Sequence, residues 1–288
     1  MNISGILPAR WRRDIPVIPV VRLTGAIVAG GTPFRPALNL ANVAGALERA
    51  YSFKRAPAVA LLVNSPGGSP VQSRLIHQRI RELAAKNGKK TLVFVEDVAA
   101  SGGYMIALAG DEIIADETSI VGSIGVVAAA FGFDKAIAKL GIDRRVYTAG
   151  ENKVILDAFQ PEKVKDVEHL KSLQAEIHAL FIAMVKERRG SRLKETPELF
   201  SGLFWTGAKA KELGLVDANG LLGEVIAQRY GEKAQLRPIG PRRGLFGRAA
   251  PGVAMPSLLP DAAAFAAELP RAAIEAVEER LLWSRFGL

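Results

Sequence analysis

Short apolar runs alternate with helical patterns through the first half of the chain, and this alternation restricts the fold more than any other feature. Ala58–Val63 and Thr91–Val95 have the length and the continuous apolar character of strands that are buried on both faces. Between them, a helical pattern begins at Ser69 and ends at Gly88. Strands separated by helices of this length predict right-handed βαβ units around a mainly parallel sheet, which is an α/β fold.

The other periodic stretches continue this pattern. Ser69 is expected to cap its helix, with Pro70 in the first turn and Gln72 placed to complete a capping box. Pro161–Arg189 predicts a long charged helix, which we expect to pack on a neighbouring molecule as much as on its own core. Further strands or helices are expected at Pro16–Val28, Asn39–Ser52, Ser101–Ala109, Glu112–Ala115, Ser123–Ala130, Asp134–Leu140, Asp143–Thr148, Ala208–Leu213 and Leu221–Tyr230.

Composition divides the chain into three parts. Residues 1–14 form a basic N-terminal segment, and residues 15–235 carry the alternating pattern of one large domain. The third part, residues 236–288, begins with a Pro/Gly-rich arm that has five prolines and four glycines within Pro238–Pro260. It ends in an amphipathic pattern, Arg271–Arg285, which predicts a helix that makes a docking or oligomer contact; binding to a membrane surface is the alternative.

Charge and the rare residue types exclude several classes of function. The 288 residues include 38 Lys+Arg and 29 Asp+Glu, a net charge of +9, but much of the excess lies near the two ends and no aromatic residues are interleaved with it. We therefore expect no nucleic-acid partner, and weak attraction to anionic lipid is the better interpretation of those ends. The absence of cysteine excludes a disulfide scaffold, a thiolate zinc site and a cysteine nucleophile. The three histidines are scattered, so neither a histidine metal site nor a Ser-His-Asp triad is expected, and no cofactor or metal is implied.

The sequence predicts neither a transmembrane segment nor a signal peptide. The longest uncharged runs, Val98–Gly110 and Thr118–Phe133, are shorter than the roughly 20 residues that span a bilayer. The basic N-terminal segment lacks the charge order of a signal peptide. We therefore expect a cytoplasmic protein, or one that associates peripherally with a membrane.

Three turns rich in glycine and serine lie where predicted strands end. They are Asn64–Gly68, Ala100–Tyr104 and Gly122–Gly125. Ligands bind at the carboxyl ends of the strands in open α/β sheets. We therefore expect the three turns to meet around one crevice.

Ser101 is the leading candidate for a nucleophile. It follows a strand and opens a helix, whose N-terminus favours negative charge nearby. The N–H groups of Gly102 and of Gly67 or Gly68 are suitable donors to an oxyanion, since glycine permits the backbone angles that point N–H groups outward. The alternative, that Ser101 only caps its helix, stays open at this point.

A serine nucleophile needs a base, and a lysine is the best candidate. All three histidines fall on predicted helices, where histidine is more often structural or solvated. Lys153 follows a predicted strand and precedes apolar residues that could bury it, and burial favours the neutral amine that a base must be. Ser123 could hold that amine in place, although a hinge serine in its turn is nearly as good an interpretation.

These motifs, together with Gly150–Lys153 and Trp205–Asp217, resemble those of the signal peptide peptidase A family (SppA or protease IV) and its SohB relatives in order and spacing. The similarity extends over residues 15–230. It implies a Clp protease/crotonase-like fold of repeated ββα and βαβ units, and Ser-Lys peptidase chemistry without a cofactor. The residues that it implies are Ser101 as the nucleophile, Lys153 as the general base, Ser123 as the contact of the lysine, and Gly67, Gly68 and Gly102 around the oxyanion.

The resemblance also implies a homo-oligomer, because family members form rings or domes, and in some of them the lysine reaches the serine of an adjacent protomer. We therefore expect a serine endopeptidase that hydrolyses extended hydrophobic peptides, such as signal-peptide remnants, through an acyl-enzyme. One alternative is a crotonase-like acyl-CoA enzyme, which would use the same N–H donors with acidic residues such as Asp97, Asp116 or Glu117. The other is a catalytically inactive oligomeric scaffold that binds peptides. Many relatives have an N-terminal membrane anchor, which this sequence does not show, so a membrane location is in question.

Overall fold

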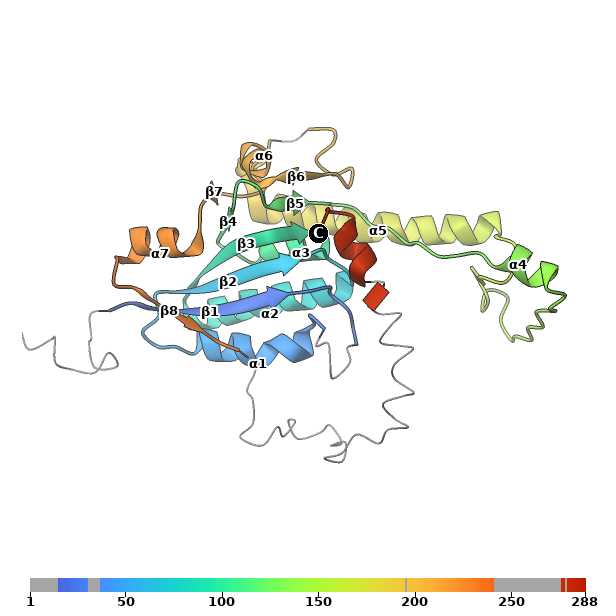
Figure 1. Ribbon diagram of the computed structural model, residues 1–288, viewed down its shortest axis with the longest axis horizontal. Helices are drawn as coiled ribbons and strands as arrows, with labels where there is room; N and C mark the ends of the chain where they lie inside the picture. Colours follow the sequence, from blue (N-terminus) through green and yellow to red (C-terminus); the bar gives the residue numbers. More distant parts are fainter. Residues whose placement is uncertain (1–14, 31–36, 195, 241–275, 278) are drawn as a thin grey trace, which may run out of the picture.

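A mostly parallel sheet carries the fold in the computed structural model, which describes residues 15–30, 37–194, 196–240, 276–277 and 279–288 (Figure 1). Within these residues the sheet has eight strands; six follow the order β6-β5-β3-β2-β1-β8, while β4 pairs with β3 and β7 pairs with β4. The strands are β1 (Val17–Thr24), β2 (Ala58–Ser65), β3 (Lys90–Ala100), β4 (Glu112–Ala115), β5 (Ile120–Gly122), β6 (Phe204–Thr206), β7 (Ala218–Asn219) and β8 (Gln235–Pro238). β5 and β6 pair antiparallel, and the other pairs are parallel, which confirms the predicted α/β fold.

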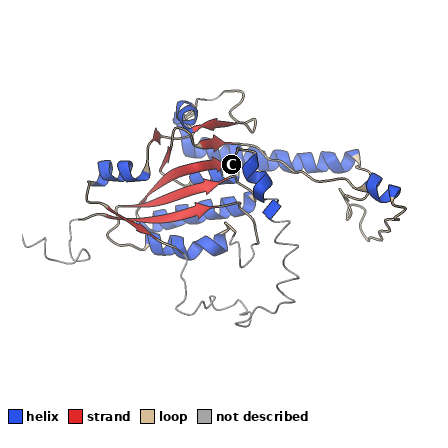
Figure 2. Cartoon of the chain, viewed as in Figure 1, coloured by secondary structure: helices blue, strands red, loops and turns tan. Residues whose placement is uncertain are grey.

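The central strands are buried on both faces, as their continuous apolar character predicts. Side chains of a strand alternate between the two faces, so a strand that is apolar throughout must be covered on both. In β2 they alternate between two apolar clusters, with Val59, Leu61 and Val63 in one and Ala60 and Leu62 in the other. The helices lie on both sides of the sheet (Figure 2): α1 (Leu40–Tyr51), α2 (Pro70–Asn87) and α3 (Gly102–Ala107) belong to the first cluster, and α7 (Leu222–Tyr230) packs on the second.

Helix α2 begins and ends at the signals that the sequence supplies, with one difference. The Ser69 hydroxyl accepts a hydrogen bond from the Gln72 N–H (3.3 Å), and Gly88 ends the helix in a left-handed conformation with a φ of 59°. The Gln72 side chain does not complete the expected capping box, because its Oε1 accepts from the Leu40 N–H at the start of α1 (3.1 Å). The Ser69 N–H that the box requires donates to the Ile27 carbonyl (2.7 Å). Gln72 therefore joins two helices instead of capping its own.

A long helix and an extended segment project from the body of the molecule. α5 (Val164–Arg189) has 26 residues, and the apolar side chains that it buries, Phe181 and Val185, lie in its C-terminal half. Residues 126–163, here called the projection, lead outward from the sheet to the start of α5 and include α4 (Asp134–Lys139) (Figure 1). None of the residues of the projection is buried. The projection and the first half of α5 therefore have little of their own chain to pack against.

The structure differs from the sequence-based prediction at short and solvent-exposed elements. Two segments that were expected to be regular, Ser123–Ala130 and Asp143–Thr148, are irregular. They lie in or beside the projection, and none of the described strands pairs with them. Strands β6, β7 and β8 were not expected, and β8 extends the sheet past the predicted domain boundary. α6 (Gly207–Glu212) and the 3₁₀ turn at Gly190–Arg192 complete the described elements of the main body.

The ends of the chain are described only in part. The basic N-terminal segment and most of the Pro/Gly-rich arm, residues 241–275, lie outside the described residues. Residues 276–277 and 279–284 are helical, inside the predicted terminal helix. Phe286 packs edge-on against Phe204 of β6, with ring centroids 5.0 Å apart, so the C-terminal residues reach the side of the sheet that carries β6. None of the helices in the described part of the chain combines the length and the apolarity needed to cross a membrane.

Candidate active site

Ser101 lies in a strained turn at the carboxyl end of β3. Its backbone has a φ of 51° and a ψ of −120°, a conformation that residues with a side chain rarely adopt. The Ser101 N–H donates to the Gly122 carbonyl (2.9 Å), and the Ser101 carbonyl accepts from the Met105 N–H (3.0 Å). Its hydroxyl makes no capping hydrogen bond to α3, which disfavours the simple helix-cap interpretation. A serine in a strained turn between a strand and a helix is typical of a nucleophile that points into a site.

Two backbone N–H groups beside Ser101 have no acceptor within the described residues. They belong to Gly68 and Gly102. The Gly67 N–H differs, because it donates to Ser65 Oγ (3.3 Å). A methyl group added to Gly67 would lie 2.8 Å from Ser101 Cβ and 2.9 Å from the Gly102 nitrogen. The turn that carries Gly67 and Gly68, here called the glycine turn, therefore lies directly against the turn that carries Ser101. Of the three predicted oxyanion residues, Gly68 and Gly102 therefore have N–H groups without an acceptor in the described structure.

The loop after β1 fixes the glycine turn. The Ile27 N–H donates to the Gly67 carbonyl (2.8 Å), the Ile27 carbonyl accepts from Ser69, and Ile27 and Gly68 form an isolated parallel bridge. Gly68 has a φ of 135°, and a methyl group there would lie 2.1 Å from the Ile27 carbonyl oxygen. Only glycine fits this position, because both the backbone conformation and the close approach exclude a side chain.

Ser123 lies beside Ser101 at the end of the neighbouring strand. β3 and β5 pair in parallel with Ala100 opposite Gly122, so Ser101 and Ser123 each follow directly after a paired residue. Ser123 is buried and also has a positive φ, 52°, and its N–H donates to the carbonyl of Leu203 (2.7 Å). The structure therefore brings Ser101, the glycine turn and Ser123 to one edge of the sheet, as the sequence predicts.

Lys153 is not part of this cluster in the single chain. It lies in a turn of the projection, is exposed, and donates its backbone N–H to the Gly150 carbonyl (3.2 Å). In the part of the chain that the structure describes, no hydrogen bond joins it to either serine. The apolar residues expected to bury it are themselves partly exposed, Ile155 by 36% and Leu156 by 37%. Figure 1 shows the projection extending away from the end of β3.

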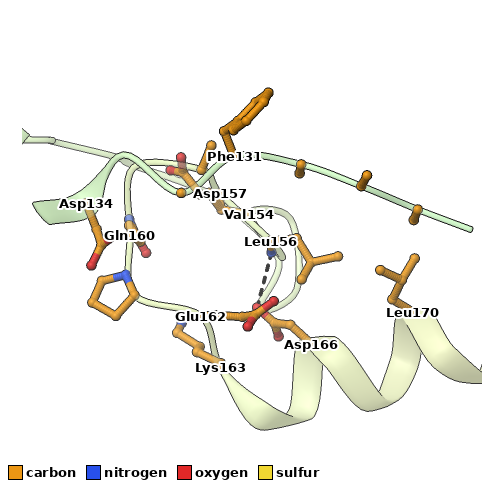
Figure 3. Close-up of a pocket in the computed structure, with 16 residues that line it drawn as sticks. Phe131, Asp134, Val154, Leu156, Asp157, Gln160, Glu162, Lys163, Asp166 and Leu170 are labelled. Atoms are coloured by element: carbon orange, nitrogen blue, oxygen red, sulfur yellow. Dashed lines mark hydrogen bonds between the residues drawn. The ribbon is translucent and has the colours of Figure 1, made fainter. Parts of the chain in front are cut away.

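A hollow of about 600 Å³ lies where the projection meets the start of α5 (Figure 3). Val154 and Leu156 line it from the projection, and Asp166 and Leu170 line it from α5. The Leu156 N–H donates to the Asp166 carboxylate (3.3 Å), and this bond fastens the projection to the first turn of α5. The hollow therefore belongs to the projection and not to the Ser101 turn. The described residues contain no group of acidic or histidine side chains that could hold a metal ion.

The histidines do not supply a base to Ser101. His77 lies on α2 with its buried Nε2 unpartnered, and His169 is exposed on the first half of α5. A ring nitrogen of His178 lies 3.1 Å from the Ile124 carbonyl, next to the Ser123 turn. Within the described residues none of the three is hydrogen-bonded to Ser101.

Asn64 also belongs to the site, although the sequence alone assigned no role to it. Its Nδ2 donates to the Asp97 carboxylate (2.5 Å), and its Oδ1 accepts from the Val98 N–H (3.2 Å). These bonds span a shift in the register between β2 and β3, just before Ser101. Bulges of this kind redirect a strand next to an active site. The polar residue at the end of a buried strand was the available signal in the sequence.

Two of the three acidic residues of the acyl-CoA alternative, Asp97 and Asp116, accept hydrogen bonds from nearby residues. Asp97 accepts from Asn64, and Asp116 accepts from the hydroxyl (2.5 Å) and the N–H (2.9 Å) of Thr118. The hydrogen bond from the Thr118 hydroxyl, followed by that from its N–H, lowers the pKa of Asp116. Neither carboxylate contacts Ser101 in the described structure.

The strained serine and the unpartnered N–H groups, at the carboxyl ends of parallel strands, together are typical of the site of a serine hydrolase. Residues 84–236, more than half of the chain, match peptidase family S49. The chain therefore belongs to peptidase family S49, and the resemblance to the SppA and SohB proteases is confirmed.

Curated relatives include proteases and two Brucella proteins that are named as ion antiporters. The chain is 34% identical to protease 4 of Haemophilus influenzae over 214 residues, which cover 73% of this chain and 34% of that protein. It is 31% identical to the chloroplastic serine protease SPPA of Arabidopsis thaliana, over 72% of this chain and 30% of that protein. It is 59% identical over 286 residues to a Brucella melitensis protein named Na(+)/H(+) antiporter NhaA, over 99% of this chain and 39% of that protein. The chain thus spans less than half the length of these three relatives.

Solved structures support the fold. The 1510-N membrane-bound stomatin-specific protease, in a mutant form, aligns with a TM-score of 0.51 over 79% of this chain and 99% of that chain. The sequence identity is 16%, so this likeness concerns the fold alone. It confirms the expected Clp protease-like α/β fold.

Proposed function

We propose that this chain is a serine endopeptidase in which Ser101 is the nucleophile and Lys153 of a second copy is the general base. The observation that carries the proposal is the strained Ser101 turn, with the unpartnered N–H groups of Gly68 and Gly102 beside it. Membership of a peptidase family favours this function over acyl-CoA chemistry and over an inactive scaffold.

The proposed reaction follows from these positions. Neutral Lys153 accepts the hydroxyl proton of Ser101 while Oγ attacks the carbonyl carbon of the peptide bond. The N–H groups of Gly68 and Gly102 stabilise the oxyanion that forms, and one such donor contributes about 3–4 kcal/mol. The C–N bond then breaks, the leaving amine takes the proton from the lysine, and an acyl-enzyme remains. Water then gives a proton to the lysine as its oxygen attacks the carbonyl carbon of the ester. The C–O bond to Ser101 breaks, Oγ takes the proton back from the lysine, and the carboxylic acid leaves.

A second copy is proposed because one chain keeps its lysine on the projection, away from its own serine. The projection exposes large apolar side chains to solvent in the single chain: Val127 (68% exposed), Phe131 (78%), Leu140 (73%) and Tyr147 (92%). An exposed apolar surface of this kind is typical of an interaction site. Contact with the body of a neighbouring copy, in a ring or dome, would bury it and remove water from Lys153, and loss of water favours the neutral amine. Ser123 would then hold that amine beside Ser101.

Extended hydrophobic peptides, such as signal-peptide remnants, are the proposed substrates. Val28 (41% exposed) follows Ile27, and Val71 (65% exposed) lies in the first turn of α2, directly after the glycine turn. Both therefore lie on segments that border the Ser101 turn. Apolar side chains next to a nucleophile favour substrates that are apolar there.

The decisive experiment mixes two inactive variants. Ser101→Ala and Lys153→Ala should each abolish peptide cleavage without changing the size of the assembly, as measured by analytical ultracentrifugation. Co-assembly of the two should restore part of the activity, because a Lys153→Ala chain keeps its serine and a Ser101→Ala chain supplies the lysine. Lys139→Ala, another exposed lysine of the projection, is the matched control and should keep full activity.

The outcomes separate the parts of the proposal. Normal cleavage by either single variant would overturn the Ser-Lys dyad. Inactive single variants that do not restore activity when co-assembled would overturn the shared arrangement and place both residues in one chain.

The proposal concerns the part of the longer relatives that this chain spans. Ion transport is named for the whole Brucella protein, and we propose peptidase activity for the region that matches this chain. We also propose that this chain contacts a membrane peripherally. An ion antiporter acts in a membrane, and the similarity of the Brucella protein to this chain supports that contact.

A further inference from the structure

Three arginines near the C-terminal end of α5 attach this helix to the body of the protein. Arg188 donates to the carbonyls of Leu108 and Gly110, at 2.8 Å each. Arg189, whose side chain is 1% exposed, forms a two-pronged ion pair with Asp217, with both N–O distances at 2.9 Å. Arg192, on the following turn, adds a third bond to the same carboxylate (3.0 Å). The end of the helix is thus fixed by charged groups and not only by apolar packing.

Asp217 is the centre of this attachment. Its carboxylate also accepts the Ile113 N–H of β4 (2.7 Å), so it joins α5 to the sheet. Burial alone would raise the pKa of Asp217, but the hydrogen bonds from Arg189 and Ile113 and the two arginine charges outweigh burial and lower it. A buried guanidinium needs such a partner, and the planar two-pronged geometry fixes direction as well as distance.

The other end of α5 carries the projection. Asp166 accepts from the Leu156 N–H (3.3 Å), and Lys165 lies 3.7 Å from Glu151, two residues before Lys153. The 26 residues of α5 give a rod of about 39 Å, so a tilt of roughly 2° at the attached end moves the far end by more than about 1 Å. Small changes at Asp217 are therefore magnified at Lys153.

We propose that Asp217 is a positioning residue for the peptidase reaction: with Arg189 and Arg192 it sets the direction of α5, and so the place where the projection presents Lys153 to the second copy. This inference rests on the proposed function. It predicts that Asp217 matters in the chain that donates the lysine and not in the chain that donates the serine.

The test uses directional co-assembly. Asp217→Asn preserves the shape of the side chain but removes the charge that holds Arg189. It is placed in the Ser101→Ala chain, which donates the lysine, or in the Lys153→Ala chain, which donates the serine. In the lysine donor the restored kcat should fall about tenfold or more, with little change in KM, since a displacement of about 1 Å can cost ~100-fold in rate. In the serine donor it should fall less than about twofold.

A second variant and a control keep the result interpretable. Arg192→Gln removes one of the two arginines that hold Asp217. Because the Arg192 side chain is 45% exposed, this change preserves the fold, and it should lower the restored kcat less than Asp217→Asn does, again only in the lysine donor. Arg229→Gln breaks the ion pair between Arg229 and Glu112 (2.6 Å), which does not involve α5, and should show no directional loss.

Each outcome decides the inference. If Asp217→Asn lowers the restored kcat equally in the lysine donor and in the serine donor, or in neither, then Asp217 serves only the stability of the fold. Either result would overturn the inference. Failure of the parent pair to restore activity would overturn the shared dyad first, and this inference with it, so the two failures are distinguishable.

Discussion

Gly67→Ala tests whether the glycine turn belongs to the oxyanion site. Gly67 has a φ of 102°, which costs a residue with a side chain about 1–2 kcal/mol. The new methyl group would lie 2.8 Å from Ser101 Cβ, 2.9 Å from the Ala100 oxygen and 2.9 Å from the Gly102 nitrogen. Two of these neighbours are backbone atoms and the third is a β-carbon, so none can rotate away. The two turns must separate, and the Gly102 N–H leaves its alignment with Ser101.

The expected result is a large loss of rate with a moderate loss of stability. Removal of one oxyanion donor lowers kcat by about 100-fold to 1,000-fold, and we expect a loss in this range. Turnover of an apolar peptide and labelling of Ser101 by a serine-directed acylating probe measure the chemistry, and denaturant unfolding measures the fold. Gly88→Ala is the matched control, because Gly88 also has a positive φ (59°) but no heavy atom lies within 4 Å of the added methyl group. It should lose about 1–2 kcal/mol of stability and no activity.

The reasoning would be refuted by a folded Gly67→Ala variant that cleaves peptides within about twofold of the parent rate, since a lost donor costs far more. An equal loss of activity in Gly88→Ala would also refute it, because strain alone would then explain the effect.

Two further predictions concern Asn64 and His77. Asn64→Ala removes the bonds to Asp97 and Val98, and should cost about 1–3 kcal/mol of stability and lower kcat more than it raises KM; an unchanged kcat would contradict the role of the bulge. Burial, followed by the charge of Arg188, lowers the pKa of His77 from 6.5 to about 4. The unfolded chain therefore binds the proton more readily, so the free energy of unfolding should fall as the pH drops from about 6.5 to 4, by at most ~3 kcal/mol. His77→Leu should remove this part of the pH dependence in denaturant titrations, and an unchanged slope would contradict it.

The sequence predicts the core of the fold because its signals are local. Continuous apolar runs predicted β2 and the first half of β3, and the residues Ser69 and Gly88 predicted the two ends of α2. Each signal depends on a few consecutive residues, and each reports burial or a cap directly.

The missed strands depend on distant partners instead. All four residues of β8 are exposed, so no apolar period marks them, and only pairing with β1 makes them a strand. β6 and β7 have three and two residues, too few for any period. In the projection the reverse holds: Asp143–Thr148 continues the predicted pattern of regular elements, but no strand in the described part of the chain pairs with it.

The residues of the candidate site were also predictable only where their position follows from the neighbouring sequence. Ser101, Ser123 and the glycines follow strands directly, so the order of the strands was enough to predict that they meet. The position of Lys153 relative to Ser101 could not be derived, because it depends in the proposed arrangement on a second molecule. The attachment of α5 at Asp217 also escaped prediction, since the residues that form it are far apart in the chain.

The pairing of β8 with β1 has a consequence for synthesis of the protein. β1 leaves the ribosome well before β8, so the backbone groups on its outer edge are paired only after residue 238 has emerged. An uncovered strand edge is a template for pairing with other chains. During translation, and in any product truncated before β8, this edge of β1 is therefore exposed and prone to aggregation, and we expect chaperones that bind extended apolar segments to act on it.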